Sequence, residues 1–479
     1  MVAMRPLALA LLASSVVTAQ LANYNCDPNA CKPPGCRCAS LAPPVANPPQ
    51  FLLLTFDDAV QEATWQQAQS LLNRKNPNGC AAKSTWYTQV NFSDPFLVTQ
   101  WYAQGNEVAD HTITHTPPFT GTYAEVEGMR KWVNELAGIP LGKITGFRFP
   151  FLNYTKDSLE MLTKMGFEYE TSMSAFDSDA VWPYTLDYGT VNDCLGIINL
   201  CGQSMQTKGL WEIPMYGFVG SDGKQHLMDP FNDPLPTAPS LTPEQLTNDY
   251  KATFDKHYNG QRAPFGVYVH PIWLGKGVPP AVPDGTAKLA AIAAFLDYAL
   301  SRPDTWMVTG AQLIQYMKNP VPASQLAAQP YMSCTPNPAP PTGICNGLGG
   351  NGTGNAAPEA CNPPEGPFRT CYGCPSSYPS LANPSPQSTS TRCRLPTTCD
   401  TLWWDPVGCK CLCTSDACKW NDNARPINLD PASLNTANNK TSGGSGTSNS
   451  NTKGNGAGTL QAGFVMLAAG VVGTVLSVL

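Results

Sequence analysis

The stretch FLLLTFDD, residues 51–58, joins an apolar run to two adjacent acids, Asp57 and Asp58. The run 51–56 predicts a strand that is buried in the core. Carboxylates that directly follow a buried strand cost free energy unless they bind something. A turn at the strand end would direct both acids into one pocket, where one could hold a metal ion while the other takes up a proton. An ordinary acidic turn is the alternative.

Strands and helices alternate from this stretch to about residue 317. We expect further strands at 84–90, 106–109, 144–149, 167–171, 210–215, 265–269 and 305–308. Amphipathic patterns between them predict helices, above all at 63–73, 123–137, 241–257 and 287–300. This alternation is typical of an α/β fold with a parallel sheet or barrel. In such folds the chemistry gathers at the C-terminal ends of the strands.

A second motif, HTITH, spans His111 to His115 and follows the strand expected at 106–109. Histidines four residues apart share one face of a helical turn, and this spacing suits capture of a transition metal. Pro117 and Pro118 would restrict any such helix to about one turn. Two unrelated histidines are the alternative. The chain has only 5 histidines, so two of them at ligand spacing favour the metal site.

Two further strand ends carry side chains that can act in catalysis. Arg148 lies at the end of the strand 144–149, in the motif RFPF, and His270 follows the strand 265–269. An arginine there can hold a carboxylate in one orientation through its fork of donors. Alone, each residue would be interpreted as structural. Their place in a series of strands that end in Asp, His and Arg favours a shared site.

These residue types fit one chemistry. Asp58, His111 and His115 would form a metal set of two histidines and one carboxylate with open coordination positions. A metal in such a site lowers the pKa of bound water to about 7 and polarises a carbonyl. Asp57 would then be the general base and His270 the general acid. The set predicts metal-assisted hydrolysis of an amide or ester.

The order TFDD, HTITH, RFPF and a late strand-end histidine resembles the polysaccharide deacetylases, specifically the secreted chitin deacetylases of eukaryotes. The resemblance runs from about Cys26 to Cys334. It includes CDPNACKPPGCRC at 26–38, NPNGC at 76–80, WPYT at 182–185, WE at 211–212 and RAP at 262–264. It implies a distorted (β/α) barrel that removes N-acetyl groups from chitin, the polymer of N-acetylglucosamine, to give chitosan and acetate.

The resemblance also implies the roles of the site residues. One divalent metal, Zn²⁺ or another ion such as Co²⁺, would be bound by Asp58, His111 and His115. Asp57 would be the base, oriented by Arg148. His270 would protonate the leaving amine.

Two further residues would contact the substrate. Trp182 would line the groove under a sugar ring, and the backbone N–H of Phe151 would help the metal to hold the oxyanion. The acid that tethers His270 stays open among three candidates: Asp177, Asp179 and Glu212.

The composition indicates a secreted protein. With 29 basic and 35 acidic residues the net charge is −6, so we expect no nucleic-acid partner. The 18 cysteines are typical of an oxidising compartment. Residues 1–19, with Arg5 before an apolar run, are typical of a signal peptide. Glycosylation sequons occur at Asn91, Asn153, Asn351 and Asn439.

The C-terminus has the pattern of a GPI-anchor signal. An apolar tail at 459–479 follows a low-complexity stalk of Ser, Gly and Asn at 421–458, which we expect to be disordered. Attachment is expected at Asn449, Ser450 or Asn455. A tail-anchored transmembrane helix is the alternative, but it lacks flanking positive charge. We therefore expect a monomer that is anchored through GPI at the outer face of the plasma membrane, or transferred to the cell wall.

The cysteines divide between two regions. An N-terminal Cys/Pro cluster at 20–50 is expected to pack on a catalytic domain at 51–334, followed by a Cys-rich region at 335–420. Eight cysteines fall on the catalytic side: Cys26, Cys31, Cys36, Cys38, Cys80, Cys194, Cys201 and Cys334. The other ten lie at 345–418, so each side can close its own disulfides.

The function of the Cys-rich region stays open between two alternatives. It is either a rigid spacer or a carbohydrate-binding region in which Trp403, Trp404 and Trp420 stack on sugars. Two rivals to chitin deacetylation also remain. One is a catalytically silent, wall-binding protein on the same fold, and the other is a deacetylase of another acetylated glycan. The intact catalytic set disfavours the first, and the secretory features favour chitin over the second.

Overall fold

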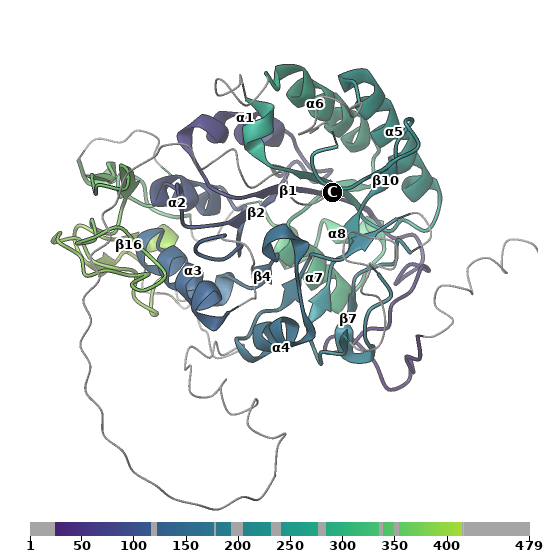
Figure 1. The fold of residues 1–479 in the computed structure, drawn as a ribbon, viewed down its shortest axis with the longest axis horizontal. Coiled ribbons are helices and arrows are strands. Elements are labelled where there is room, and N and C mark those ends of the chain that lie inside the picture. The colour runs from purple at the N-terminus through teal and green to yellow at the C-terminus, as the bar shows by residue number, and fades with distance from the viewer. Residues whose placement is uncertain are drawn as a thin grey trace, which may run out of the picture. The chain divides into compact units, whose positions relative to one another are not determined.

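The longest described strand is β1 (Gln50–Asp57), which is buried along its whole length (Figure 1). Because successive side chains of a strand point to opposite faces, β1 contributes to two cores. Leu52, Leu54 and Phe56 pack in the larger cluster, with side chains of the surrounding helices. Phe51 and Leu53 pack in the second cluster. This two-sided burial explains the uninterrupted apolar run.

We analysed a computed structural model, which describes residues 24–115, 122–176, 179–192, 205–230, 241–275, 284–334, 339–348, 354–413 and 415. These residues belong to one compact unit, Met1–Phe231 with Ser240–Leu429. The remaining segments, Asn232–Pro239 and Asp430–Leu479, lie outside the described residues. Several sequence-based predictions also fall outside them: the signal peptide, the stalk, the anchor signal with its attachment sites, Asn351, Asn439, Cys194, Cys201 and Trp420.

The main sheet confirms the expected distorted (β/α) barrel as a curled and largely parallel sheet. Its strand order is β12 (Phe265–Val269), β1, β2 (Thr85–Thr88), β3 (Glu107–Asp110), β4 (Gly146–Phe147), β5 (Tyr169–Glu170), β8 (Trp211–Glu212) and β7 (Tyr184–Thr185). A further strand, β13 (Thr305–Met307), pairs with the start of β1. Among the described strands of this sheet, β7 and β8 are the one antiparallel pair. The C-terminal ends of β12, β1, β2, β3 and β4 therefore lie along one edge.

Helices connect these strands and cover the sheet. The helices expected from the sequence are α1 (Glu62–Leu72), α3 (Tyr123–Leu136), α5 (Pro243–Asn259) and α6 (Thr286–Leu300). The structure adds α2 (Pro95–Ala103), α4 (Lys156–Lys164), α7 (Gly310–Lys318) and α8 (Ala323–Leu326). Asp94, Thr155 and Thr309 cap three of these added helices by accepting a backbone N–H. Capping residues before short helices were thus the sequence signal for these elements.

Short strands form separate two-stranded sheets outside the main sheet. They are β6 (Ser174–Ala175) with β9 (Met215–Tyr216), β10 (Phe218–Val219) with β11 (Gln225–His226), β14 (Glu359–Cys361) with β15 (Phe368–Thr370), and β16 (Trp404–Asp405) with β17 (Lys410–Cys411). Across the described ranges, no helix is both long enough and apolar enough to cross a membrane.

Seven disulfides are described, and each lies wholly on one side of residue 335. Those on the N-terminal side are Cys26–Cys38, Cys31–Cys36 and Cys80–Cys334. Those on the C-terminal side are Cys345–Cys371, Cys361–Cys374, Cys393–Cys409 and Cys399–Cys411. Trp403 and Trp404 are only 6% and 7% exposed, so they form the core of the Cys-rich region and not a platform for sugars.

Candidate active site

The four sequence motifs meet at the edge where the parallel strands end. Asp57 is the last residue of β1, and Asp58 follows it with a left-handed φ of 76°. Two contacts hold this conformation, because the Asp58 N–H donates to Tyr87 O at 3.0 Å and Trp86 Nε1 donates to Asp58 O at 3.0 Å. The kink brings both acids near His111, although neighbouring strand residues face opposite ways.

Three side chains could hold a metal ion. Asp58 Oδ1 lies 3.8 Å from His111 Nε2 and 3.4 Å from His115 Nε2. One ligand atom from each of the three residues lies within 4.8 Å of the others. Two imidazole nitrogens and one carboxylate oxygen suit Zn²⁺ or a similar divalent ion. The residues present therefore fit the metal that the sequence predicts.

The surroundings of His111 prepare it as a ligand. Its Nδ1 lies 2.8 Å from the carbonyl oxygen of Arg148, so Nδ1–H donates there and Nε2 keeps its lone pair for a metal. Burial, followed by the neighbouring His115, lowers the pKa of His111 to about 3. The ring is therefore neutral at physiological pH, which metal binding requires.

The loop that carries the two histidines is not the helical turn that their spacing predicts. Thr112 and His115 both have positive φ values, 71° and 50°. The Thr112 N–H donates to Asp110 Oδ1 at 2.8 Å, and Glu125 of α3 accepts the two next backbone N–H groups. Side chains from β3 and α3 thus replace helical hydrogen bonds, so the two histidines come together through a local structure other than the predicted helical turn.

Arg148 holds Asp57, as expected from the sequence. Its Nη1 donates to Asp57 Oδ1 at 2.6 Å and to Thr55 Oγ1 at 3.0 Å, while Nε donates to Thr171 O at 2.9 Å. The buried guanidinium lies 4.1 Å above the centre of the Tyr87 ring. Burial acts to lower the pKa of Arg148, but the charge of Asp57 outweighs it and raises that pKa. The second oxygen of Asp57 remains directed to the pocket, 3.9 Å from His111 Nε2.

His270 is tethered by an acid that the sequence analysis missed. Asp229 accepts hydrogen bonds from the His270 backbone N–H, at 2.9 Å, and from its ring Nδ1. The ring Nε2 points into the site, 3.7 Å from Asp58 Oδ2. Burial acts to lower the pKa of His270, but the charge and hydrogen bond of Asp229 dominate and raise it to about 10.

Of the three acids that the sequence offered as the tether of His270, two are wrong and one cannot be placed. Asp179 accepts the Phe176 N–H at 2.6 Å, Glu212 is buried in β8, and Asp177 lies outside the described residues. Asp229 follows an isolated bridge between Met228 and Tyr268, which brings it beside β12. No motif marks it, since its position depends on pairing with a distant strand.

Comparison with known proteins assigns this site to a family. The sequence profile of the polysaccharide deacetylase family matches residues 45–170, which include Asp58, His111 and His115. The chain contains a polysaccharide deacetylase domain. Residues 45–170 are thus similar to the hydrolases that deacetylate polysaccharides.

Two chitin deacetylases of the silkworm Bombyx mori are similar to most of the chain. Chitin deacetylase 8 is 29% identical over 405 residues, which cover 78% of this chain and 97% of that protein. Chitin deacetylase 1 is 28% identical over 390 residues, covering 75% and 68% respectively. Both similarities extend beyond the polysaccharide deacetylase domain itself.

Two solved structures are similar to parts of this chain. A putative polysaccharide deacetylase from Mycobacterium smegmatis has a TM-score of 0.41 and 17% identity, covering 58% of this chain and 94% of its own. A family 4 carbohydrate esterase from Streptomyces lividans, in complex with acetate, has a TM-score of 0.29 and 16% identity, covering 54% and 91%.

Trp182 is buried and does not line a groove. Its side chain is 1% exposed and packs against Phe51 and Tyr316 in the second core cluster. Its Nε1 donates to Gln261 O at 3.0 Å, which satisfies the indole in the interior. The predicted stacking under a sugar ring was wrong, because the tryptophan belongs to the core of the fold.

Phe151 lies beside the metal set. It has a φ of 57°, its side chain is 41% exposed, and its ring centre is 4.7 Å from that of His115. Phe92, in the loop after β2, is the most exposed large apolar residue described, at 67%. Both rings belong to loops at the edge that carries the site. The use of the Phe151 N–H for an oxyanion stays a prediction.

Proposed function

We propose that this protein hydrolyses N-acetyl groups of chitin to give chitosan and acetate, with the help of one divalent metal ion, Zn²⁺ or, as a substitute, Co²⁺. The observation that carries the proposal is the convergence of Asp58, His111 and His115 beside Asp57 and His270. The similarity to two Bombyx mori chitin deacetylases supports chitin as the substrate. When bound, the metal would polarise the acetyl carbonyl and lower the pKa of water.

Asp57 is suited to act as the general base. One carboxylate oxygen is held by Arg148, and the other faces the pocket. A fixed carboxylate can take a proton from the water that attacks the acetyl carbon without a cost of reorientation.

His270 is suited to act as the general acid. Asp229 fixes the ring through Nδ1, so that Nε2–H faces the site and can pass its proton to the leaving amine nitrogen. The raised pKa of His270, about 10, means that the ring carries this proton at neutral pH. Proton transfer to the amine accompanies cleavage of the C–N bond and releases acetate and a free amino sugar.

The substrate would be positioned by groups at the rim of the site. We propose that the backbone N–H of Phe151 donates to the carbonyl oxygen as it becomes negatively charged. The exposed rings of Phe92 and Phe151 would contact the apolar faces of sugar rings along the chain. These two aromatics take the role that the sequence analysis gave to Trp182.

Secretion and membrane attachment also remain proposals. The disulfides are typical of an extracellular protein. Of the sequons, Asn153 is exposed, whereas the Nδ2 of half-buried Asn91 donates to Thr114 O at 3.4 Å. We propose Asn153 as the more accessible glycan site of the two. Phospholipase C treatment of intact cells should release a GPI-anchored protein, and retention on the cells would contradict the anchor.

Acetate release from N-acetylglucosamine oligomers tests the function directly. We expect release by the secreted full chain, loss after chelation and recovery on addition of Zn²⁺ or Co²⁺. Acetate release from peptidoglycan or from O-acetylated glycans, and none from the chitin oligomers, would assign another substrate. No acetate from any of these substrates under any divalent metal would favour a silent wall-binding protein.

A further inference from the structure

Glu125 fastens the loop that carries the two histidine ligands. Its Oε2 accepts the backbone N–H groups of Ile113, at 3.1 Å, and of Thr114, at 3.0 Å. Its Oε1 accepts the hydroxyl of Thr114 at 2.6 Å. Glu125 lies in the first turn of α3 and is only 9% exposed. One carboxylate therefore satisfies three donors of the segment between His111 and His115.

The same helix is packed closely between this loop and the Cys-rich region. A Cβ atom on Gly128 of α3 would lie 3.2 Å from Ile113 Cδ1 and 3.4 Å from Pro384 Cβ. Ile113 is the central residue of the histidine loop, and Pro384 belongs to the Cys-rich region. Glycine at this position thus lets the region approach the helix directly over the loop.

Side chains of the Cys-rich region also bind the C-terminal end of α3. Thr370 Oγ1 donates to Leu136 O at 2.6 Å, and Arg394 Nη1 donates to Glu135 O at 2.6 Å. Thr401 Oγ1 donates to the carbonyl oxygen of Gly138, just beyond the helix. The last carbonyls of a helix lack partners within the helix, so these contacts complete its end.

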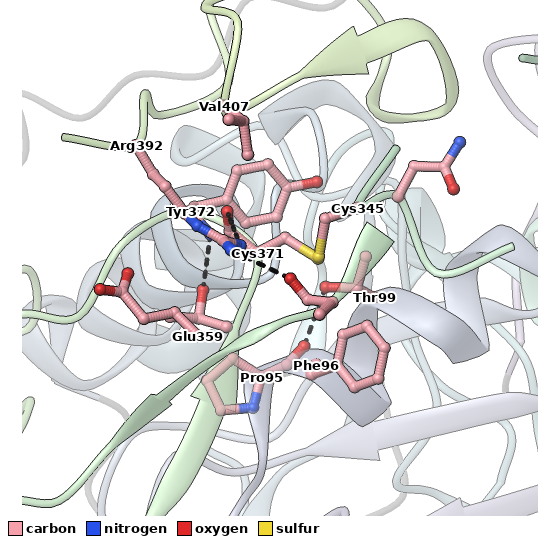
Figure 2. The surroundings of a disulfide bond; sticks show 12 residues. Pro95, Phe96, Thr99, Cys345, Glu359, Cys371, Tyr372, Arg392 and Val407 are labelled. Carbon is pink, nitrogen blue, oxygen red and sulfur yellow. Dashed lines mark hydrogen bonds between the residues drawn. A yellow bond between two sulfur atoms is a disulfide. The ribbon is translucent and has the colours of Figure 1, made fainter. Parts of the chain in front are cut away.

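The disulfide Cys345–Cys371 anchors the residues that make these contacts (Figure 2). Cys371 directly follows Thr370 and precedes Tyr372, whose ring fills the space over Gly138. Figure 2 shows the bridge next to Phe96 and Thr99 of α2, and the bridge shares a buried cluster with Phe96. The bridge therefore ties the Cys-rich region to both α2 and the end of α3.

We infer that the Cys-rich region is an internal brace for the metal-ligand loop, acting through α3 and the positioning residue Glu125. This inference rests on the proposed metal site and adds a function to a region otherwise interpreted as a spacer. Residues that position the ligands of a metal site contribute about 10–100-fold to its affinity. The region would thus tune metal affinity without contributing a ligand of its own.

Metal affinity of the full chain tests Glu125. In Zn²⁺ titrations of metal-free protein against a competing chelator, Glu125→Ala should weaken binding by about 10–100-fold. The Co²⁺ absorption spectrum should change as well. Glu125→Gln should keep most of the affinity, since its amide oxygen can still accept the two N–H groups. Glu127→Ala is the matched control, because Glu127 pairs with Lys131 on the same helix and should leave affinity unchanged.

The brace itself is tested by two changes in contacts with the Cys-rich region. Removal of the Cys345–Cys371 bridge by paired Cys→Ala substitutions should weaken Zn²⁺ binding, whereas removal of Cys361–Cys374, outside the shared cluster, should not. Gly128→Ala should also weaken Zn²⁺ binding, although alanine favours a helix over glycine by about 1 kcal/mol. That substitution keeps the test valid if the bridge variant fails to fold.

Amide hydrogen exchange supplies a readout that needs no metal. The N–H groups of Ile113 and Thr114 should exchange faster in metal-free Glu125→Ala and Gly128→Ala than in the wild type. Unchanged exchange and unchanged Zn²⁺ affinity in these variants would overturn the inference while leaving the proposed function intact. A wild-type protein that binds no divalent ion would instead overturn the proposed function. In that case, unchanged amide exchange in the two variants would be enough to reject the brace.

Discussion

Asp229 accepts two hydrogen bonds from His270, one from the backbone N–H and one from ring Nδ1, across a sequence separation of 41 residues. The pair sets both the direction of the ring and its protonation, because the carboxylate favours the charged imidazolium. This relationship supports the proposed role of His270 as the general acid.

Asp229→Asn should lower kcat by about 10²-fold or more with little change in metal affinity. The lost charge removes what raises the pKa of His270 to about 10, so the alkaline limit of activity should move to lower pH. Acetate release across pH, with Zn²⁺ affinity measured in parallel, checks both effects. An unchanged alkaline limit would contradict the assignment of His270 as the acid.

Substitution of each of the two adjacent aspartates in turn should distinguish loss of catalysis from loss of metal binding. Asp57→Asn should reduce kcat by about 10²–10⁴-fold and retain the metal, since an amide oxygen can still accept from Arg148. Asp58→Asn should lose the metal together with activity. Metal content after dialysis and acetate release distinguish the two variants. Loss of metal from the Asp57 variant would reverse the roles.

Phe92→Ala should weaken the binding of long N-acetylglucosamine oligomers more than the binding of the two-sugar oligomer. The ring is 67% exposed, and its burial under a sugar chain would contribute about 1.5 kcal/mol, or roughly tenfold in KM. Phe92→Tyr, which keeps the ring and the sequon at Asn91, is the control. Equal KM values for Phe92→Ala and wild type across oligomer lengths would exclude this contact.

Trp182→Ala should destabilise the fold, because the indole is in the core. Truncation of a buried tryptophan costs about 3–5 kcal/mol, measurable as a lower midpoint in denaturant unfolding. The KM of the folded fraction should stay near the wild-type value. A raised KM with normal stability would restore the groove role that the sequence suggested.

Much of the fold could be predicted because local sequence carries it. Strands such as 51–56 and 265–269 are apolar runs, and helices such as 123–137 show periodic faces. The metal set was also accessible, since Asp58 and the histidines of HTITH lie in short motifs at strand ends. The helices α2 and α7 were missed because their weak patterns depend on caps and on burial against neighbours.

The sequence by itself determined the strand series, the candidate metal ligands and the cysteine-rich ends of the domain, because each depends on residues adjacent in the chain. Only the tertiary structure decided that Asp229 tethers His270, that Glu125 fastens the ligand loop and that Trp182 is buried. These features depend on which distant segments pair. A hydrogen bond or a buried contact between distant segments needs both segments, and a single stretch of sequence contains only one of the two.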